Sequence, residues 1–263
     1  MITYDFSEKV VVVTGSARGI GRRIAERFYA AGAKVALCSI SKTGKEELMQ
    51  EIAGDDCSRI MALSADVSRP EEVAAFLQAV VDAFGTIDVL VNNAGIYSKE
   101  DTCEVTEERY DKVMDANLKS VFFACQWFFK HHLAAGTTGN VVNIASVSSV
   151  TYVPDNALYN VSKAGVVTLT KTFARDMGKH GIRVNAVGPG SIPTDLNAAL
   201  YADPQKEIEL CDKIPLGRRG TKDDIERRVQ LFNGSGCLCR GWLAARLREV
   251  LYDLGIVEGY VYE

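Results

Sequence analysis

Apolar and polar positions alternate along this chain in a way that predicts strands and helices in turn. Short apolar runs rich in β-branched residues, the pattern of buried parallel strands, occupy residues 10–13, 34–38, 60–65, 87–91, 141–144 and 182–187. Longer stretches of helical character lie between them, at residues 22–31, 43–53, 70–84, 106–133 and 156–180. This order predicts an α/β fold, a doubly wound parallel sheet with helices on both faces and right-handed crossovers.

Four residues with distinctive chemistry fall just after predicted strands. They are Gly15, Asn92, Ser146 and Pro189. Because ligands of doubly wound sheets bind beyond the carboxyl ends of the strands, we expect these four positions to meet at one cleft.

A glycine-rich turn follows the first predicted strand, in the sequence Thr14-Gly-Ser-Ala-Arg-Gly-Ile-Gly21. A strand, a glycine-rich turn and a helix in succession aim free backbone N–H groups at a pyrophosphate. Gly15 permits the tight turn, Gly19 lets a ligand approach the backbone, and Gly21 lets helix and strand pack closely. The alternative is a strand-to-helix turn that binds no ligand.

Tyr159 and Lys163 are four residues apart on a predicted helix, so both side chains lie on one face. A tyrosine has an unperturbed pKa of about 10, too high for proton exchange at neutral pH. An adjacent ammonium favours the phenolate and is expected to lower that pKa, which gives a usable acid and base. Such a pair also arises easily by chance, so its meaning depends on the other motifs.

Taken together, these motifs resemble the short-chain dehydrogenase/reductase family. The resemblance rests on the glycine-rich turn at residues 14–21, the Asn92-Asn-Ala-Gly95 motif, Asn117, Ser146, Tyr159, Lys163 and Pro189-Gly190, in the family's order. It covers about residues 5 to 225. It implies a single Rossmann-type domain over residues 1–263 and an oxidoreductase that transfers hydride between NAD(P) and a carbonyl or secondary alcohol.

The resemblance also implies roles for the catalytic set. Ser146 would hydrogen-bond the substrate carbonyl, and Tyr159 would donate a proton to its oxygen in reduction and accept one in oxidation. Lys163 would lower the pKa of Tyr159 and hold the nicotinamide ribose. Asn117 resembles the family asparagine that anchors a water between the lysine and solvent. The alternative is a polar residue that satisfies a helix kink, and one residue can do both.

Further residues would hold the cofactor. Asn92 and Gly95 would shape its wall, Asp66 and Val67 would contact adenine, and Thr194 would bond the carboxamide. The full set of expected cofactor-binding residues is Gly15, Ser16, Arg18, Gly19, Ile20, Gly21, Ser39, Asp66, Val67, Asn93, Ala94, Gly95, Tyr159, Lys163, Pro189, Gly190, Ile192 and Thr194.

The end of the second strand favours NADP(H) over NAD(H). A carboxylate there would bond the ribose 2′-hydroxyl and repel a 2′-phosphate, but the position falls at about Ser39 and holds none. Arg18 can reach a 2′-phosphate, with Ser41 and Lys42 as nearby donors. Arg18 as a solvated loop residue is the alternative.

Composition narrows the remaining possibilities. The 263 residues are 47% hydrophobic, enough for one large core, and the net charge of −4 gives no electrostatic case for nucleic acid or an anionic membrane. Seven cysteines without framework spacing indicate a reducing cytoplasm, and the pair Cys237 and Cys239 has the wrong spacing for a zinc site, so we expect no metal. The N-terminus has no secretory pattern, and no run is long enough to span a bilayer.

Substrate identity stays open. The expected pocket segments, residues 97–101, 147–156 and 191–211, mix polar and apolar side chains. The motifs resemble those of 3-oxoacyl-thioester reductases and of sugar, polyol and steroid dehydrogenases alike. We expect a small-molecule carbonyl or alcohol substrate and, by resemblance, a homo-oligomer, either a tetramer or a dimer.

Residues 226–263 depart from the family pattern of an apolar helix, a Thr-Gly-Gln-type turn and a final strand. Residues 242–254 fit one face of a helix, whereas 250–252 or 256–262 fit a displaced strand. A reading-frame change and natural divergence both explain the departure, and a missing strand would expose a sheet edge. The rival function is therefore a non-catalytic nucleotide-binding regulatory or scaffold protein whose C-terminus does not complete the active site.

Overall fold

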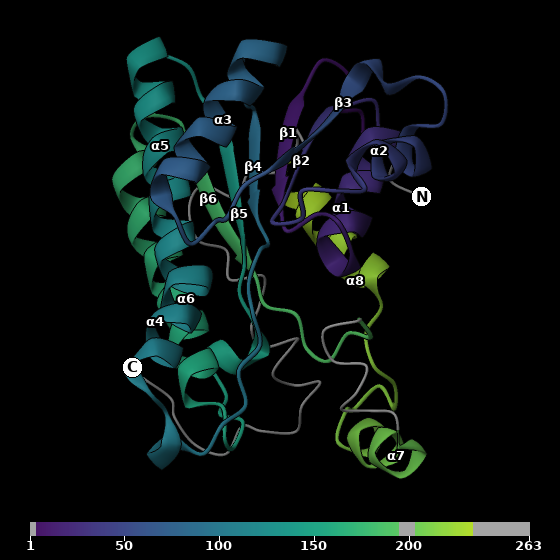
Figure 1. Ribbon diagram of the computed structural model, residues 1–263, viewed down its shortest axis with the longest axis vertical. Helices are drawn as coiled ribbons and strands as arrows, with labels where there is room; N and C mark the ends of the chain where they lie inside the picture. The colour runs from purple at the N-terminus through teal and green to yellow at the C-terminus, as the bar shows by residue number, and fades with distance from the viewer. Residues whose placement is uncertain (1–3, 195–202, 234–263) are drawn as a thin grey trace.

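Six parallel strands form the middle layer of the molecule, with helices on both sides (Figure 1). The computed structural model describes residues 4–194 and 203–233. The strands are β1 (Val10–Thr14), β2 (Lys34–Ser39), β3 (Ile60–Ser64), β4 (Val89–Asn92), β5 (Asn140–Ile144) and β6 (Arg183–Val187). The helices are α1 (Gly19–Ala30), α2 (Lys45–Ala53), α3 (Pro70–Phe84), α4 (Glu107–Met114), α5 (Ser120–Ala135), α6 (Ala157–Gly178), α7 (Pro204–Asp212) and α8 (Lys222–Asn233).

The sheet has the strand order β3-β2-β1-β4-β5-β6, and every neighbouring pair is parallel. From β1 the chain proceeds to β2 on one side, while β4 pairs with β1 on the other side. The order therefore reverses at β1, and the carboxyl ends of β1 and β4 border the crevice where doubly wound sheets bind ligands. The predicted α/β fold is confirmed.

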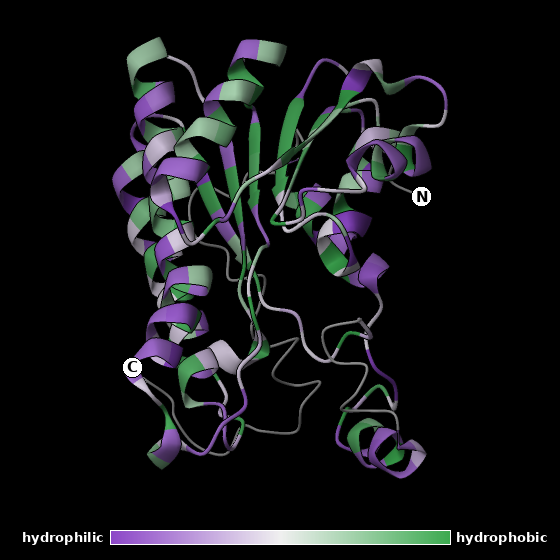
Figure 2. Cartoon of the chain, viewed as in Figure 1, coloured by the Kyte–Doolittle hydropathy of each residue, from purple (hydrophilic) through white to green (hydrophobic). Residues whose placement is uncertain are grey.

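The apolar strand residues point alternately to two cores. Val10 and Val12 pack with α3, α5 and α6, whereas Val11 and Val13 pack with α1, α2 and α8. All five β1 residues are buried, which explains why this strand reads as a continuous apolar run. Figure 2 shows the same division, with hydrophobic residues along the sheet and hydrophilic ones on the outer sides of the helices.

The segment predicted as one long helix within residues 106–133 is divided by a π-helical turn, η3 (Asp115–Lys119). Thr106 caps α4 by accepting a hydrogen bond of 3.2 Å from the backbone N–H of Arg109. The extra residue of a π turn rotates the following helix, and it turns Asn117 inward, where that side chain is completely buried. Such turns are frequent at functional sites.

Helix α8 covers the α1 side of the sheet through Ile225, Val229 and Phe232, which join the core around α1. The helix therefore continues past residue 225, where the family pattern was expected to end. Within the described residues β6 is an edge strand. The alternatives for residues 242–262, helix or displaced strand, lie outside the described residues.

Candidate active site

The glycine turn has the geometry expected of a dinucleotide site. Gly15 and Gly19 have φ angles of +64° and +63°, which other residues rarely adopt. A Cβ on Gly15 would lie 2.8 Å from Ala94 Cα, and one on Gly21 would collide with the Gly15 carbonyl oxygen. Above Gly19, by contrast, the nearest atom to such a Cβ is 3.8 Å away, on Thr194. The turn is tight where it packs and open where a ligand approaches, which fits a pyrophosphate.

Helix α1 begins at Gly19, earlier than the predicted residue 22, so its first N–H groups follow this turn directly. Arg18 is the N-cap residue, its side chain is exposed, and no acidic residue stands in the first turn of the helix. The positive end of the helix dipole is therefore free of nearby carboxylates within α1. Ser16 does not face outward, because its completely buried hydroxyl accepts a hydrogen bond of 3.0 Å from the Cys38 backbone N–H.

The Asn92–Gly95 motif is fastened to this turn. The hydroxyl of Thr14 accepts hydrogen bonds from the backbone N–H groups of Asn93 and Ala94, both at 3.0 Å. The Asn93 amide in return donates to the carbonyl oxygens of Thr14 and Gly15, at 2.9 and 3.1 Å. These bonds join the ends of β1 and β4 into one rigid wall.

Asn92 was expected to shape the cofactor wall, but its side chain points into the core. Its amide donates to Asn143 Oδ1 at 2.8 Å, and Asn143 donates to Thr170 Oγ1 on α6 at 2.9 Å. Asn143 on β5 therefore links side chains of β4 and α6 rather than bonding backbone. The network ties β4, β5 and α6 together beneath the site.

Tyr159 and Lys163 lie on one face of α6, as the spacing predicted. The Lys163 ammonium is 5% exposed, donates to the Ile144 carbonyl oxygen at 2.8 Å, and lies 5.9 Å from the centroid of the Tyr159 ring. Burial lowers the pKa of Lys163 to about 8. The lysine therefore reaches from α6 to the end of β5. Removal from water disfavours its protonated form, which is why its pKa is lowered.

The predicted lowering of the Tyr159 pKa by Lys163 is wrong for the protein by itself. Burial raises the pKa of Tyr159 above its usual value, a hydrogen bond from the Ser146 side chain opposes that rise, and the neighbouring Tyr97 adds to it. The Lys163 ammonium donates to the Ile144 carbonyl oxygen and lies 5.9 Å from the Tyr159 ring centroid, and it is not among the groups that shift the Tyr159 pKa. Ser146 is the residue that favours the phenolate here.

Ser146 is held by a cap at the end of β5. Its hydroxyl accepts from the Ser148 backbone N–H at 3.1 Å, and its own backbone N–H donates to Ser149 Oγ at 3.3 Å. Ser149 in turn donates to the Lys163 carbonyl oxygen at 2.9 Å, which joins the cap to α6. This reciprocal cap fixes the serine hydroxyl next to the tyrosine.

Asn117 fills the kink between α4 and α5 and also supports the site. Its Oδ1 accepts from the Ile96 backbone N–H at 2.8 Å, and its Nδ2 donates to the Ile96 carbonyl oxygen at 3.0 Å and to Ser162 Oγ at 3.1 Å. A Cβ on Gly95 would lie 2.9 Å from Asn117 Oδ1 and 3.5 Å from Lys163 Nζ. Asn117, Gly95 and Lys163 are thus brought together, as predicted.

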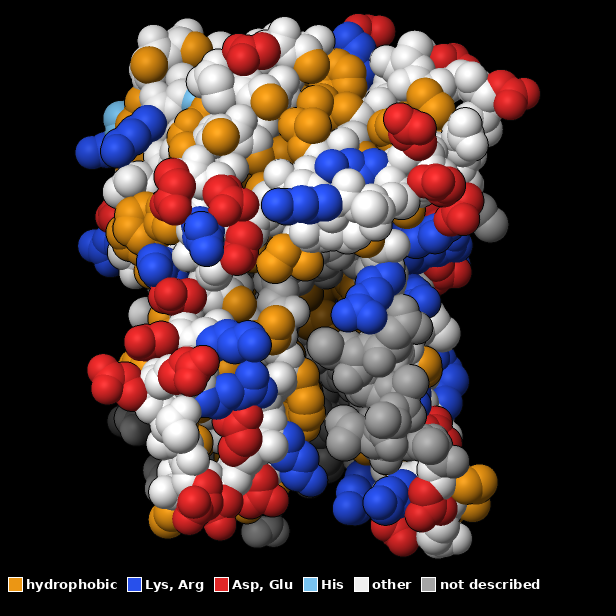
Figure 3. All heavy atoms as spheres, in the orientation of Figure 1, with side chains coloured by type: hydrophobic (Ala, Val, Ile, Leu, Met, Phe, Trp, Pro, Cys, Tyr) orange, Lys and Arg blue, Asp and Glu red, His pale blue; other side chains and the backbone are white. Residues whose placement is uncertain are grey.

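The remaining predicted residues border the same edge of the sheet. Pro189 accepts a hydrogen bond from the Val147 backbone N–H at 2.9 Å, which brings the loop after β6 beside Ser146. Ile192 is buried, whereas Gly190 is exposed and Thr194 is partly exposed. At the other end, Ser39, Asp66 and Val67 are partly exposed at the ends of β2 and β3, and Asp66 Oδ1 accepts from Ser68 Oγ at 2.7 Å. Figure 3 shows the surface hollowed below the sheet, between the lobe with α4 and the segment with α7.

Comparison with known proteins now identifies this arrangement. A family model described as enoyl-(acyl carrier protein) reductase matches residues 15–232. The chain is 37% identical over 222 residues to 2-dehydro-3-deoxy-D-gluconate 5-dehydrogenase of Escherichia coli (strain K12), covering 84% of this chain and 87% of that one. The chain belongs to the short-chain dehydrogenase/reductase family.

Other members of this family have different named activities. The chain is 38% identical to 3beta-hydroxysteroid dehydrogenase 1 of Eggerthella lenta, over 84% of this chain and 85% of that one. It is 39% identical to the 3-oxoacyl-[acyl-carrier-protein] reductase FabG of Staphylococcus epidermidis, over 84% and 89% of the two chains. Among solved structures, an actinorhodin polyketide ketoreductase variant with NADPH superposes with a TM-score of 0.81 at 32% identity, over 87% of this chain and 91% of that one.

Membership confirms three predictions from the sequence: the family, the fold and an oxidoreductase acting on CH–OH or C=O groups with a nicotinamide dinucleotide. The oxidoreductase interpretation is supported over the alternative of a non-catalytic binding protein. The searched helices of the described chain include none long and apolar enough to cross a membrane. Residues 4–194 and 203–233 hold no cluster of three or more potential metal ligands.

Three side chains of this short-chain dehydrogenase have positions that sequence reasoning did not anticipate. Tyr97 and Asn156 were expected only to line the pocket, yet they hydrogen-bond each other beside Tyr159. Arg219 donates to Ser191 Oγ at 3.0 Å and to Glu207 Oε2 at 2.9 Å, which joins the loop after β6 to α7. For Asn156 the available signal was its position at the start of the predicted helix, three residues before Tyr159.

Proposed function

We propose that this short-chain dehydrogenase reduces a small carbonyl compound, or oxidises the corresponding secondary alcohol, with Tyr159 exchanging the proton at the reacting oxygen. The observation that carries the proposal is the arrangement at the end of β5 of the capped Ser146 hydroxyl, Tyr159 and buried Lys163, in which Ser146 opposes the rise of the Tyr159 pKa caused by burial. Two hydroxyl groups that converge at the carboxyl edge of the sheet can both meet one carbonyl oxygen. That arrangement is what proton transfer to a developing alkoxide requires.

The glycine turn, the wall at residues 93–95 and the loop at 189–194 would hold the nicotinamide dinucleotide. When bound, the dinucleotide supplies or accepts the hydride. Gly15, Gly19, Ile20 and Gly21 would contact its pyrophosphate through backbone N–H groups, and Pro189, Gly190, Ile192 and Thr194 would border its nicotinamide end. Ser39, Asp66 and Val67 would border the adenosine end.

Within the site each side chain has a separate task. Ser146 would donate a hydrogen bond to the carbonyl oxygen and stabilise the charge that grows there, and it keeps the Tyr159 hydroxyl oriented. Lys163 is placed to hold a ribose hydroxyl at the end of β5. Asn117 would keep the Ile96 backbone and Ser162 in place beside that lysine.

We further propose a preference for NADP(H). The end of β2 carries Ser39 without a carboxylate, and the exposed side chains of Arg18, Ser41 and Lys42 can surround a 2′-phosphate. The replacement Arg18→Gln should weaken NADPH binding about tenfold and leave NADH binding nearly unchanged, because only the phosphate contact is lost. Equal weakening of both cofactors, measured by titration of intrinsic fluorescence, would refute this preference.

The first experiment is thermal unfolding of the purified protein with NADPH, NADH or neither, followed by a screen of carbonyl substrates. A ligand of the folded state at a hundredfold excess over its Kd stabilises by about 2.7 kcal/mol. A cooperative transition that rises with the cofactor, together with substrate-dependent NADPH oxidation, is expected. A rise without turnover on any carbonyl would favour the non-catalytic alternative.

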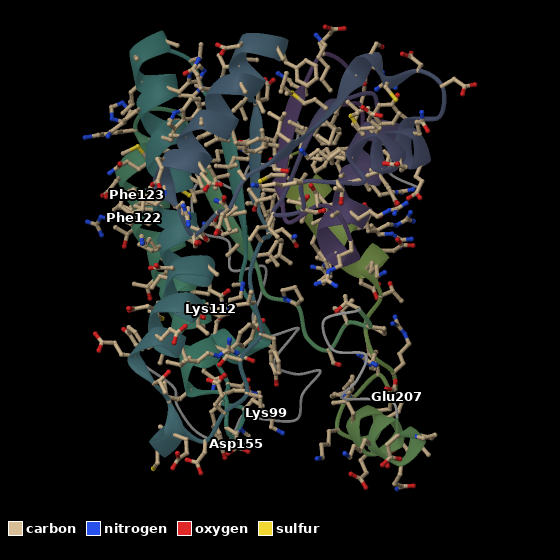
Figure 4. The ribbon with its side chains drawn as sticks, in the orientation of Figure 1. Lys99, Lys112, Phe122, Phe123, Asp155 and Glu207 are labelled. Carbon is tan, nitrogen blue, oxygen red and sulfur yellow. The ribbon has the colours of Figure 1, made fainter. Side chains whose placement is uncertain are left out.

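The outer face of α4, α5 and α6 supports the proposal of a homo-oligomer. It forms an apolar groove lined by Met114, Leu118, Lys119, Phe122, Phe123, Gly165, Thr168 and Leu169. Figure 4 shows Phe122 and Phe123 on the outer side of α5, away from the sheet. We propose that a second copy of the chain covers this groove and that the protein works in the cytoplasm. Phe122→Lys should shift the molecular mass in solution to that of a smaller species, as measured by light scattering.

A further inference from the structure

A second phenol, that of Tyr97, lies against Tyr159. Tyr97 belongs to the loop that leaves β4, and its ring meets the Tyr159 ring edge-on, with centroids 5.2 Å apart and planes at 64°. Its presence also contributes to the raised pKa of Tyr159. The reacting proton is therefore exchanged next to a second hydroxyl-bearing ring that the family motifs do not include.

Asn156 holds the Tyr97 hydroxyl. Asn156 is 2% exposed at the start of α6, and its side-chain amide forms a hydrogen bond of 2.9 Å with Tyr97 Oη. With the amide in one orientation Nδ2–H donates to the phenol oxygen, and in the opposite orientation the phenol O–H donates to Oδ1. In the first orientation the phenol O–H remains free to donate a hydrogen bond to a ligand. In the second orientation the phenol oxygen remains free to accept one.

The loop that carries Tyr97 is fastened independently of any ligand. The Glu100 backbone N–H donates to the Asp155 carbonyl oxygen at 2.7 Å, and the Glu100 carboxylate accepts from Ser98 Oγ at 3.0 Å and pairs with Arg109 of α4. Figure 4 shows Asp155 close to Lys99, the residue before Glu100, below α4 and α6, with Glu207 of α7 across the hollow from them. The Tyr97 ring is thus positioned before a substrate arrives.

The ring contact places this hydroxyl near the reacting centre. Asn156 is the N-cap residue of α6, and Tyr159 and Lys163 follow on one face of that helix. The Tyr97 hydroxyl is bonded to Asn156, and the Tyr97 ring lies 5.2 Å from the Tyr159 ring between centroids, so the second phenol borders the reacting centre. Oxygens on neighbouring or next-neighbouring carbons of a substrate span such a distance once a hydrogen bond is included.

We propose that Tyr97, oriented by Asn156, is a specificity-determining residue that hydrogen-bonds a second oxygen of the substrate, adjacent to the reacting carbonyl. The preferred substrates are then hydroxylated carbonyl compounds and the polyols formed from them. A ketone with no second oxygen would displace water from the Tyr97 hydroxyl and offer it no hydrogen bond in return. Binding of such a ketone is therefore disfavoured. This inference rests on the proposed oxidoreductase function.

The test compares three six-membered rings with NADPH: cyclohexanone, 2-hydroxycyclohexanone and 1,2-cyclohexanedione. We expect the wild type to favour 2-hydroxycyclohexanone over cyclohexanone in kcat/KM. Tyr97→Phe should lower that ratio about tenfold, mainly through KM, because one neutral hydrogen bond is lost. The ratio does not depend on the fraction of protein that is folded, so a destabilised variant still gives a valid answer.

Two further variants complete the design. Asn156→Ala keeps the phenol but frees its orientation, and it should lower the same ratio by a smaller factor. Tyr110→Phe, at an exposed tyrosine on α4, should leave the ratio unchanged. A ratio unchanged by both Tyr97→Phe and Asn156→Ala overturns the inference, although the oxidoreductase function stands. A wild-type preference for the dione alone overturns the assignment to hydroxylated substrates. Turnover of none of the three rings by a wild type that reduces other carbonyls in the screen also overturns it, while the oxidoreductase function is decided by that screen.

Discussion

Helices α6 and α8 pack against opposite faces of the same sheet, yet their buried polar side chains differ in how completely they are hydrogen-bonded. On α6 the buried polar residues are Ser162, Lys163 and Thr170, and each one hydrogen-bonds a partner from the sheet, its loops or the helix backbone. On α8, within the described residues, both carboxylate oxygens of Glu226 and the Oδ1 of Asn233 have no hydrogen bond. Arg27 Nε lies 3.2 Å from Glu226 Oε1, but the alignment is not that of a hydrogen bond.

The difference follows from what each helix must position. A buried polar group without a partner costs about 1–3 kcal/mol, so the pairing of these three residues favours one orientation of each side chain. The exception on α6 is the Oδ1 of Asn160, which is buried without a hydrogen bond. That precision is needed where two hydroxyls must meet one substrate oxygen. Helix α8 is held instead by Ile225, Val229 and Phe232, whose apolar contacts are not directional. The catalytic side of the fold is therefore specified more sharply than the α8 side.

The largest effect is expected from removing the reacting hydroxyl of α6. Tyr159→Phe should lower kcat by a factor of about 10² to 10⁴, because general acid–base catalysis is lost while the ring remains. The thermal shift produced by NADPH should be nearly that of the wild type. Retained turnover in a steady-state assay would remove Tyr159 from the mechanism, and any α8 variant with an equal loss would contradict the comparison.

Lys163 is the exception that sharpens the comparison, since it is hydrogen-bonded and yet disfavoured by burial. The pKa of Lys163 falls from 10.5 to about 8 on folding, so its charge opposes folding below pH 8. Between pH 8 and 10.5 the folded state loses the proton before the unfolded state does, and the cost of burying the charge disappears. Lys163→Met should therefore be more stable than the wild type at pH 7, and by pH 10.5 that advantage should shrink by about 3 kcal/mol. Urea unfolding without cofactor at both pH values measures it. Lys179→Met, at an exposed lysine after α6, is the matched control, and the same trend there would refute the burial argument.

Breaking the network under α6 tests whether its hydrogen bonds matter. Asn143→Leu replaces a completely buried amide by an apolar side chain of similar branched shape and removes partners from Asn92 and Thr170. The free energy of unfolding should fall by about 2 kcal/mol. In a double-mutant cycle, Thr170→Val should cost less in the Asn143→Leu background than in the wild type. Strict additivity of the two changes would mean that the bond between these residues contributes nothing.

The smallest change in stability is expected on α8, and it should be a gain, opposite to the loss expected for Asn143→Leu. Burial raises the pKa of Glu226 above its usual 4.5, with Asp223 adding to the rise and Arg27, Arg23 and Arg227 opposing it. Because the folded pKa is the higher one, the stability from the protonated form is present below pH 4.5 and is lost as the pH rises through the folded pKa. Glu226→Gln should therefore stabilise by about 1 kcal/mol at pH 7 and not at pH 4. Glu209→Gln, on the exposed side of α7, should do neither.

Much of the fold could be predicted because its signals are local. The six apolar runs, the glycine turn and the Tyr159–Lys163 spacing each lie within a few residues, and all led to the correct elements. A kink at Asn117 was one of the alternatives from the sequence, but its form as a π turn could not be predicted, because Asn117 bonds Ile96, a partner on another segment. The network of Asn143 could not be predicted for the same reason, since its partners come from β4 and α6.

The sequence by itself determined the family, the sheet and the positions of the catalytic groups along the chain, because backbone propensity and helical spacing are properties of short segments. Only the tertiary structure decided the state of those groups. It bonded the Lys163 ammonium to the Ile144 carbonyl oxygen, and it brought Tyr97 and Asn156 together beside the Tyr159 ring. A pKa or a hydrogen bond depends on distance and on removal from water, and those quantities arise only when distant segments pack against one another.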